Sequence, residues 1–352
     1  MTAEVNGRVV RMLLDNGFLW DPILFFGGPG VDSLGLVYDG EADVGGSGDG
    51  ESVASKTVSG ITIRFPGVEF TDQTGIVAPG LGRMWTGAEG QVSATFLKHF
   101  VVDINFDTRV ITLIEPDRFH DSGRGAEVRL RPLLPGAWGI PATLGTSDGR
   151  VLEMDLMMDL GQWDPLNVST AGPHNLRIPE GAVAASLGFG IQGEIRGHFG
   201  RVPSVEVGGY RIPDVVCGFT SPEEGWGSYH EAMIGLELLS HFNLVFDYPG
   251  GRMFIEPNHA FTEPFEYDMS GMALRKLEEN RLEVVRVTPG SPAEAAGLRV
   301  GDEVARIQGI AAAEYDAWDL HAALREEGGV VRLIVVRDGR ETDVLLTLRR
   351  LI

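Results

Sequence analysis

The chain has 352 residues, of which 43% are hydrophobic and 22% charged, a composition that fits two or three globular domains. Fifty acidic and 29 basic side chains give a formal net charge of −21, which would repel phosphate backbones and anionic bilayers, so nucleic acid is not expected as a partner. The single cysteine, Cys217, rules out an internal disulfide, while 48 glycines and 19 prolines indicate many tight turns. Turns at this frequency favour β structure.

No apolar stretch approaches the roughly 18 to 20 residues that a membrane-spanning helix requires. Residues 1–5 lead almost at once into an apolar segment, with no basic region followed by an apolar one. The localisation therefore stays open. If an export signal has been removed, the protein is expected to be periplasmic or secreted. Otherwise it is expected in the cytoplasm.

Two similar segments open the two halves of the chain. Residues 6–17 run through an apolar stretch to Asp-Asn-Gly, and residues 148–161 run through another to Asp-Leu-Gly. Each is followed by Trp-Asp-Pro, at residues 20–22 and 163–165, which we interpret as turns with a packed indole or as part of a substrate wall. The alternation within each apolar stretch predicts short, half-buried strands.

A second pair of similar segments closes the two halves. Residues 96–105 resemble residues 238–247, and each continues into an apolar strand that ends in Glu-Pro. The beginnings of these segments, residues 96–100 and 238–242, predict one short helix in each half. Two matching pairs in the same order indicate a duplicated lobe, with the polar, glycine-rich residues 117–127 as a linker.

The two Asp-x-Gly segments carry the chemistry of interest. Two carboxylates about 3 Å apart cannot both ionise, so they share a proton, and one can activate water while the other polarises a carbonyl. The glycine after each aspartate lets the backbone turn sharply towards its counterpart. With the later Met233-Ile234-Gly235 segment, these features resemble the two-lobed, retropepsin-like aspartic proteases of the pepsin-type clan, in particular bacterial ones that carry a PDZ domain.

This resemblance implies a catalytic pair and two supporting loops. Asn16 and Leu160 stand where the family has a hydroxyl residue that ties the two loops together; Asn16 can replace it, whereas Leu160 cannot. Phe18 and Gln162 replace a small residue, and their bulk narrows or blocks the site. The implied catalytic residues are Asp15 and Asp159, and the implied supporting residues are Asn16, Gly17, Leu160 and Gly161.

Glycine-rich stretches follow each aspartate at residues 45–50 and 188–193. The family resemblance implies a mobile flap at this point, and the alternative is an exposed loop. Other motifs are weaker. Residues 121–123 read Asp-Ser-Gly but lie in the linker, and residues 145–149 match G-x-S-x-G but precede a strand where that motif requires a helix. The histidines show no zinc spacing, so neither a metal nor a cofactor is predicted.

The last ninety or so residues resemble the PDZ domains of bacterial proteases. Ser291, Pro292 and Gly297 are placed to cap, start and end a short helix, and residues 316–326 predict the helix beside a peptide groove. PDZ domains take a peptide as an added strand and capture its terminal carboxylate with backbone amides. The alternative is a domain that only packs against the lobes. The loop implied to bind the peptide is Ser270, Gly271, Met272 and Ala273.

The sequence thus predicts a mainly β protein with two tandem retropepsin-like β-barrel lobes and a small α+β PDZ domain. The expected boundaries are 1–118, 128–260 and 263–352. The expected function is that of an aspartic endopeptidase whose PDZ module recognises peptides, acting on a peptide or protein substrate with a C-terminal peptide ligand at the PDZ loop. The alternative is an inactive scaffold that binds peptides through its interlobe groove and PDZ domain.

Overall fold

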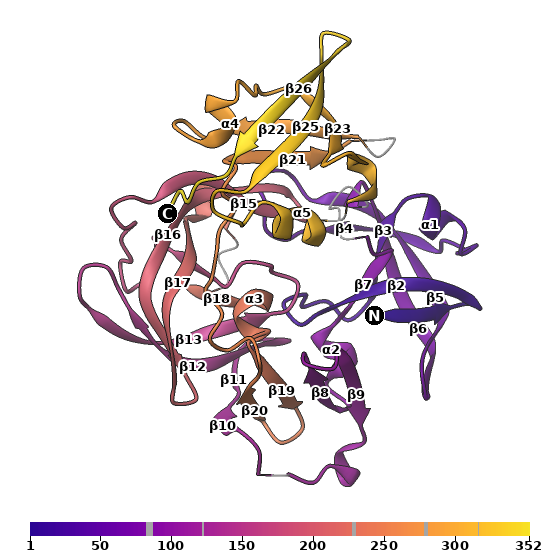
Figure 1. Ribbon diagram of the computed structural model, residues 1–352. Coiled ribbons are helices and arrows are strands. Elements are labelled where there is room, and N and C mark those ends of the chain that lie inside the picture. Colours follow the sequence, from indigo (N-terminus) through magenta and orange to yellow (C-terminus); the bar gives the residue numbers. More distant parts are fainter. Residues whose placement is uncertain (82–86, 122, 227–229, 278–280, 316) are drawn as a thin grey trace.

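The computed structural model describes residues 1–81, 87–121, 123–226, 230–277, 281–315 and 317–352. Within these residues the strands form four sheets, and the helices are short (Figure 1). The mainly β fold that the sequence predicts is confirmed.

The first half of the chain forms a seven-stranded sheet. Its second strand shows why the sequence folds this way, since Val10 and Met12 are buried while the residues that precede them, Val9 and Arg11, are exposed. In sheet order the strands are β1 (Thr2–Val5), β2 (Arg8–Asp15), β7 (Gly90–Ser93), β3 (Ile23–Gly27), β6 (Val68–Pro79), β5 (Val53–Phe65) and β4 (Gly40–Val44).

The second half forms an eight-stranded sheet of the same design. The two longest strands of this sheet meet at a tight hairpin in which Gly208 and Gly209 both have positive φ. In sheet order the strands are β11 (Arg131–Leu134), β12 (Ala137–Gly145), β13 (Val151–Asp159), β18 (Ala232–Gly235), β14 (Leu166–Ser169), β17 (Tyr210–Thr220), β16 (Gly193–Val207) and β15 (Val183–Gly190).

The same pairing pattern occurs in both sheets. β2 pairs in parallel with β7 as β13 does with β18, and β3 pairs in parallel with β6 as β14 does with β17. The antiparallel pairs β3–β7 and β14–β18 join these units in both halves. Seven strands of one sheet therefore have a counterpart in the other. The repeat in the sequence is thus also a repeat in the backbone structure.

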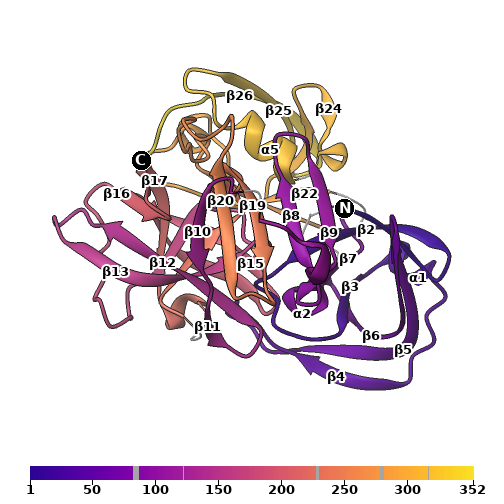
Figure 2. The same ribbon diagram turned by 90° about the horizontal axis from the view of Figure 1, so that it is seen from below.

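A third, five-stranded sheet contains strands from both halves, which lie side by side in Figure 2. β8 from the first half pairs with β19 from the second, with Ile104 opposite Leu244. One hydrophobic core extends through all three sheets, so the halves share both hydrogen bonds and buried surface. In sheet order the strands are β10 (Ala126–Arg129), β20 (Arg252–Pro257), β19 (Phe242–Asp247), β8 (Val101–Asn105) and β9 (Val110–Ile114).

The short helices of the two lobes begin earlier than the sequence predicts. The expected helices at 96–100 and 238–242 are replaced by α2 (Ala94–Leu97) and α3 (Leu236–Leu239). The second cannot extend further because Phe242 is buried as the first residue of β19. The remaining helical turns of the lobes are α1 (Pro29–Asp32), η2 (Pro116–Arg118) and η3 (Pro222–Glu224).

The C-terminal domain has a sheet and a hydrophobic core of its own. Ser291 caps its first helix by accepting a hydrogen bond from the N–H of Glu294, and Gly297 has a φ of 78° just beyond the helix, as expected. The expected helix at 316–326 is shorter, and Asp316 lies outside the described residues. The elements are β21 (Met272–Lys276), β22 (Leu282–Val287), α4 (Pro292–Ala295), β23 (Glu303–Ile307), β24 (Ile310–Ala311), η5 (Ala312–Glu314), α5 (Ala317–Ala323), β25 (Val330–Arg337) and β26 (Arg340–Thr347).

The core of the C-terminal domain begins at Met269, a few residues after the expected boundary at 263. Phe265 instead belongs to the core of the lobes, and the ring of Tyr267 lies 4.4 Å from that of Phe199 in β16. The segment before Met269 thus packs on the second lobe and connects it to the C-terminal domain.

Candidate active site

The two aspartates occupy equivalent strand ends. Asp15 is the last residue of β2 and Asp159 the last of β13. In the parallel pairs beside them, Asp15 lies opposite Ser93 and Asp159 opposite Gly235. The duplicated topology therefore brings both side chains to the junction of the two lobes.

Backbone amides fix the orientation of each carboxylate. Oδ1 of Asp15 accepts hydrogen bonds from the N–H groups of Gly17 and Phe18, both at 2.9 Å. Oδ1 of Asp159 accepts the equivalent bonds from the N–H groups two and three residues further on, at 2.7 and 3.1 Å. Hydrogen bonds of this kind stabilise the ionised carboxylate and hold it in one rotamer.

The side chains of Asp15 and Asp159 are hydrogen bonded to each other. Each also lies over the glycine of the opposite loop. A Cβ atom added to Gly17 would be 2.2 Å from Cγ of Asp159, and one added to Gly161 would be 2.6 Å from Cγ of Asp15. Only glycine leaves room for the two carboxylates to meet, which is a stricter requirement than the sharp turn that the sequence suggested.

The pKa of both carboxyl groups is raised. Burial is the largest cause for Asp15, followed by the negative charge of Asp159, and the pKa of Asp15 rises well above its usual value. Burial also raises the pKa of Asp159, but its hydrogen bonds with Asp15 and with two amides oppose the rise. The pair therefore retains one proton at a pH where isolated aspartates are ionised.

Asn16 links the two loops. Its Oδ1 accepts a hydrogen bond from the N–H of Leu160 at 2.7 Å, and both residues are buried. The hydroxyl of Tyr248 also hydrogen bonds to Asn16. The Leu160 side chain packs in the core of the lobes and makes no such link, so the loops are tied from one side. Tyr248 lies in the turn between β19 and β20, and its contact with Asn16 gave no sequence signal.

The glycine-rich tips at 45–50 and 188–193 bind each other. The N–H of Gln192 donates to the carbonyl oxygen of Ser47 at 2.9 Å, and the N–H of Gly50 donates to the carbonyl oxygen of Gln192 at 2.6 Å. The Gln192 side chain accepts a further bond from the N–H of Gly46 at 3.0 Å. Both tips belong to corresponding hairpins, β4–β5 and β15–β16, so the lobes meet here as well as at the aspartates.

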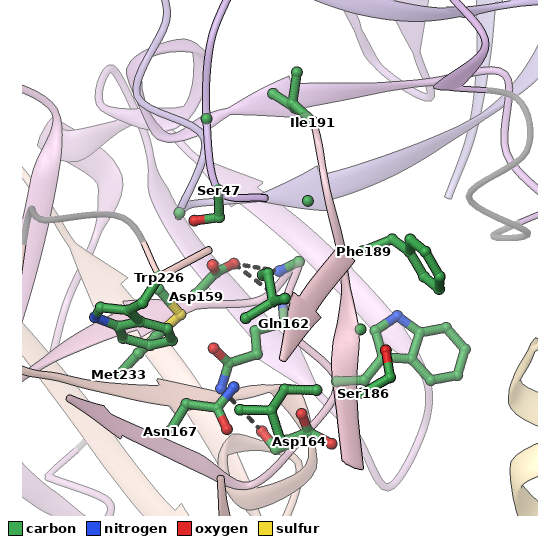
Figure 3. Close-up of a pocket in the computed structure, with 18 of the residues that line it drawn as sticks. Ser47, Asp159, Gln162, Asp164, Asn167, Ser186, Phe189, Ile191, Trp226 and Met233 are labelled. Carbon is green, nitrogen blue, oxygen red and sulfur yellow. Dashed lines mark hydrogen bonds between the residues drawn. The ribbon is translucent and has the colours of Figure 1, made fainter. Parts of the chain in front are cut away.

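These tips border the cavity that contains the aspartates. Figure 3 shows Ser47 and Ile191 on one side of Asp159 and Gln162, with Asp164 and Asn167 on the other. The cavity has a volume of about 580 Å³. Its walls are rich in apolar side chains, including Phe18, Trp20, Phe189, Trp226 and Met233. Phe18 thus borders the cavity without filling it.

The loop of the C-terminal domain that the sequence assigned to a peptide carboxylate is internally bonded. Oδ1 of Asp268 accepts hydrogen bonds from the N–H groups of Ser270 at 2.7 Å and Gly271 at 3.3 Å. The N–H of Met272 donates to Oγ of Ser270 at 3.1 Å. The following residue, Ala273, lies in β21 opposite Arg286. Of the four residues predicted to form the loop, Met272 and Ala273 lie in β21, and the sequence did not predict these acceptors.

A family model described as "PDZ domain" matches residues 283–337, which include β22, α4, β23 and α5. The C-terminal domain is a PDZ domain. The sequence predicts a peptide groove between residues 270–273 and the helix that the structure shows as α5, and the space between β21 and α5 is called the groove below.

Two solved structures resemble parts of the chain. The first, "Photosystem II D1 C-terminal processing protease", is 21% identical, with a TM-score of 0.23, and the match covers 26% of each chain. The second is an aspartic proteinase from Irpex lacteus, 12% identical, with a TM-score of 0.46 and a match that covers 74% of this chain and 94% of the other. Among curated proteins, none matches this chain. Identities and TM-scores this low support no inference about function. An inference about function must therefore come from the residues of this chain.

The cavity of the aspartates continues into the groove of the PDZ domain. The same cavity is lined by Asp15 and Asp159, by residues 271–274 at the start of β21, by Leu320 on α5 and by Leu324 just after this helix. In Figure 1 the PDZ domain lies over β15 and β16, with α5 next to the lobes. Nothing in the sequence placed these two sites together, because the lobes and the PDZ domain are separate sequence units.

Asp164 is a further ionisable residue of this cavity that the sequence treated as part of a turn. It keeps some surface open to the cavity, yet desolvation raises its pKa to about 7, aided by the charge of Glu237 and opposed by Arg325 and a hydrogen bond from Asn167. Its counterpart in the first lobe, Asp21, has a side chain that is 79% exposed. The repeated Trp-Asp-Pro motif therefore has two different environments.

An ion pair joins the second lobe to the PDZ domain beside this cavity. Arg325 donates two hydrogen bonds to the carboxylate of Glu237, at 2.7 and 2.8 Å. Both side chains are largely buried. A second pair, Arg286 with Glu194 of β16 at 3.1 Å, connects β22 to the hairpin that carries Gln192.

The remaining candidates from the sequence have structural roles. Residues 145–149 form the turn between β12 and β13, and His241 stacks on Phe265 with ring centres 4.4 Å apart. In the described part of the chain, no group of three or more histidine, cysteine, aspartate or glutamate side chains is arranged to hold a metal ion. None of the described helices has the length and apolarity of a membrane span, and α5, the longest, has seven residues.

Proposed function

We propose that the chain is an aspartic endopeptidase whose catalytic residues are Asp15 and Asp159. The observation that carries this proposal is the hydrogen bond between the two carboxyl groups in a cavity between lobes of equivalent topology. A carboxyl pair that shares one proton supplies both an acid and a base, and hydrolysis of a peptide bond requires both. The PDZ domain adds peptide recognition.

The environments of the two aspartates assign their roles. Asp15 carries the shared proton, because burial and the charge of Asp159 both favour its neutral form. Asp159 is the ionised partner, because hydrogen bonds from Asp15 and from two amides stabilise its charge. Asp159 takes a proton from water as the water oxygen attacks the carbonyl carbon, and Asp15 gives its proton to the carbonyl oxygen.

The tetrahedral intermediate then decomposes with the proton movements reversed. The proton on Asp159 passes to the amide nitrogen as the carbon–nitrogen bond breaks. Asp15 takes a proton from a hydroxyl of the intermediate as the carboxylic acid product forms. Both aspartates return to their starting states, so the cycle needs no metal or cofactor.

The proposal is tested by incubating the full chain with an unfolded polypeptide, the oxidised B chain of insulin, between pH 3 and 7 and identifying products by mass spectrometry. The expected result is cleavage that falls by about 10²- to 10⁴-fold in Asp15→Asn and in Asp159→Asn, the usual size of an acid–base contribution. Asp21→Asn is the matched control because it makes the same substitution at an aspartate whose side chain is 79% exposed. Cleavage near that of the unsubstituted chain in either dyad variant contradicts the mechanism.

Two observations favour an inactive peptide-binding scaffold as the second candidate. Leu160 leaves the loops tied from one side, and the two glycine-rich tips are bonded to each other beside the site. A scaffold binds the insulin B chain without cleaving it at any pH in this range. Binding with intact peptide after prolonged incubation would therefore select this candidate over the enzyme.

A further inference from the structure

The groove of the PDZ domain has an open strand edge that faces the cavity of the aspartates. β21 lies at the edge of its sheet and pairs only with β22 among the described strands. Residues 271–274, where this edge begins, line the cavity together with the aspartates. An extended peptide can bind to such an edge through its main chain, with side chains seated between the strand and α5.

At the start of this strand, three successive backbone amides that could bind a terminal carboxylate already donate hydrogen bonds within the loop. The N–H groups of Ser270 and Gly271 donate to Asp268, and that of Met272 donates to Oγ of Ser270. The Asp268 carboxylate therefore already accepts hydrogen bonds that a ligand carboxylate would need from this loop. A second carboxylate close to it would also be repelled.

The charges of the cavity disfavour a terminal carboxylate as well. Arg286 is the one arginine or lysine among the described cavity residues, and its guanidinium is paired with Glu194. Burial lowers the pKa of His230 to about 4 and that of His321 to about 3, so both are neutral near neutral pH. The acidic residues that line the cavity are Asp15, Asp159, Asp164 and Asp268.

From this juxtaposition we infer that the PDZ groove receives an internal, extended segment of a polypeptide, not its C-terminal carboxylate, and that the same polypeptide continues to the aspartates. The groove binds by main-chain pairing along β21, and the chain passes the loop at 270–273 instead of ending there. The second half of this inference rests on the proposed function, whereas binding to the groove does not. The substrate class is an unfolded protein or a long peptide with free or blocked ends.

Binding is tested on the full-length Asp159→Asn protein, so that bound peptides stay intact whether or not the natural chain is an enzyme. The probes are two libraries of random-sequence dodecapeptides, identical except that one has free C-terminal carboxylates and the other C-terminal amides. Peptides retained by the immobilised protein are identified by mass spectrometry. The expected result is equal retention of both libraries with the same enriched residues. Retention restricted to the free-acid library, or no retention of either, overturns the inference.

Two variants of the same protein locate the binding. Ala273→Trp fills the groove beside β21 and is expected to reduce retention by about tenfold or more, the equivalent of about 1.4 kcal/mol. Leu345→Trp places the same side chain on the exposed face of β26, where Leu345 is 60% exposed, and retention is expected to stay unchanged. Equal retention by both variants places the peptide elsewhere and overturns the inference.

Asp268→Ala supplies a test in the opposite direction. Removal of this carboxylate frees the amides of Ser270 and Gly271. It also removes the negative charge that excludes a ligand carboxylate. A folded Asp268→Ala protein, checked by its cooperative thermal unfolding, is expected to retain the free-acid library better than the amide library. A folded variant without this preference contradicts the role given to Asp268.

The path of the polypeptide from the groove to the aspartates is tested separately, by measuring the peptidase activity of the natural chain. Ala273→Trp is expected to lower kcat/KM for 20-residue peptides about tenfold more than kcat/KM for hexapeptides that contain the same cleavage site. An equal loss for both lengths overturns the shared path. If the natural chain cleaves nothing, the proposed function fails, while the retention experiments still decide what the groove binds.

Discussion

Oδ1 of Asn16 accepts a hydrogen bond from the backbone N–H of Leu160 at 2.7 Å. A side chain from the first lobe thereby fixes the backbone next to Asp159 in the second lobe. The carboxamide of Asn16 supplies the acceptor of this link between the loops. No equivalent bond runs from the apolar side chain at 160, and this one contact therefore has a large share in aligning the loops.

Asn16→Ala is expected to lower the free energy of unfolding by about 1–3 kcal/mol, because it leaves the buried N–H of Leu160 without its acceptor. Urea denaturation measures this change. Asn105→Ala is the matched control, since Oδ1 of Asn105 accepts a bond from the N–H of Thr108 in an exposed turn, and it is expected to cost less. Equal losses in the two variants would contradict a special role for Asn16.

Gly17→Ala is expected to abolish any peptidase activity and to reduce stability, because its Cβ would be 2.2 Å from Cγ of Asp159. Either the carboxylate pair separates or the loop moves. Gly28→Ala is the control: its φ of 166° suits any residue, and the nearest atom to an added Cβ lies at 3.9 Å. Cleavage of the insulin B chain and thermal unfolding provide the two measurements. Full activity in Gly17→Ala would show that the pair tolerates a wider spacing.

Asp164→Asn is expected to change the pH dependence of stability. In the folded protein the pKa of Asp164 is raised from 3.8 to about 7, so between these values the folded state binds more protons than the unfolded state. Stability from this group is therefore present below about pH 4 and is lost as the pH rises to about 7, with a slope of up to about 1.4 kcal/mol per pH unit.

The variant removes this loss, so its stability relative to the natural chain should increase from pH 4 to pH 7. Chemical denaturation across this range gives the difference. His230 and His321, whose pKa values are lowered, act in the opposite direction, but they are present in both proteins and cancel in the comparison. Asp21→Asn is the control, and an equally flat difference for both variants would refute the assignment.

Gln192→Ala is expected to loosen the contact between the glycine-rich tips. The variant loses the bond from the N–H of Gly46 to Oε1 and the weaker bond from Nε2 to the carbonyl oxygen of Gly50. Hydrogen exchange of the Gly46 amide should accelerate by about two- to tenfold, as the loss of one or two exposed hydrogen bonds implies.

Gln73→Ala is the control for this prediction, because the Gln73 side chain makes one exposed bond to the carbonyl oxygen of Thr71. Exchange of the Gly46 amide should not change in that variant. An unchanged rate in Gln192→Ala as well would mean that the backbone bonds between the tips suffice to hold them together.

Local patterns in the sequence determined the general plan of this protein. Alternation around Val10 and Met12 and the glycine pair at 208–209 specify strands and a hairpin, because these depend on neighbouring residues only. The cap at Ser291 and the stop at Gly297 fix a helix in the same way. The repeat also located both aspartates, since equivalent strands end at equivalent places in two copies of one fold.

Only the tertiary structure decided how these parts function together. The motif Trp-Asp-Pro is the same in both lobes, yet Asp21 is exposed and Asp164 has a strongly raised pKa. Desolvation of Asp164 and the charge of Glu237 outweigh the opposing charge of Arg325, which comes from the PDZ domain. The bonds of Gln192 and Tyr248 join segments distant in the chain and leave no local signal. Burial and charge at such contacts depend on all the elements that meet there, and a sequence pattern describes only one of them at a time.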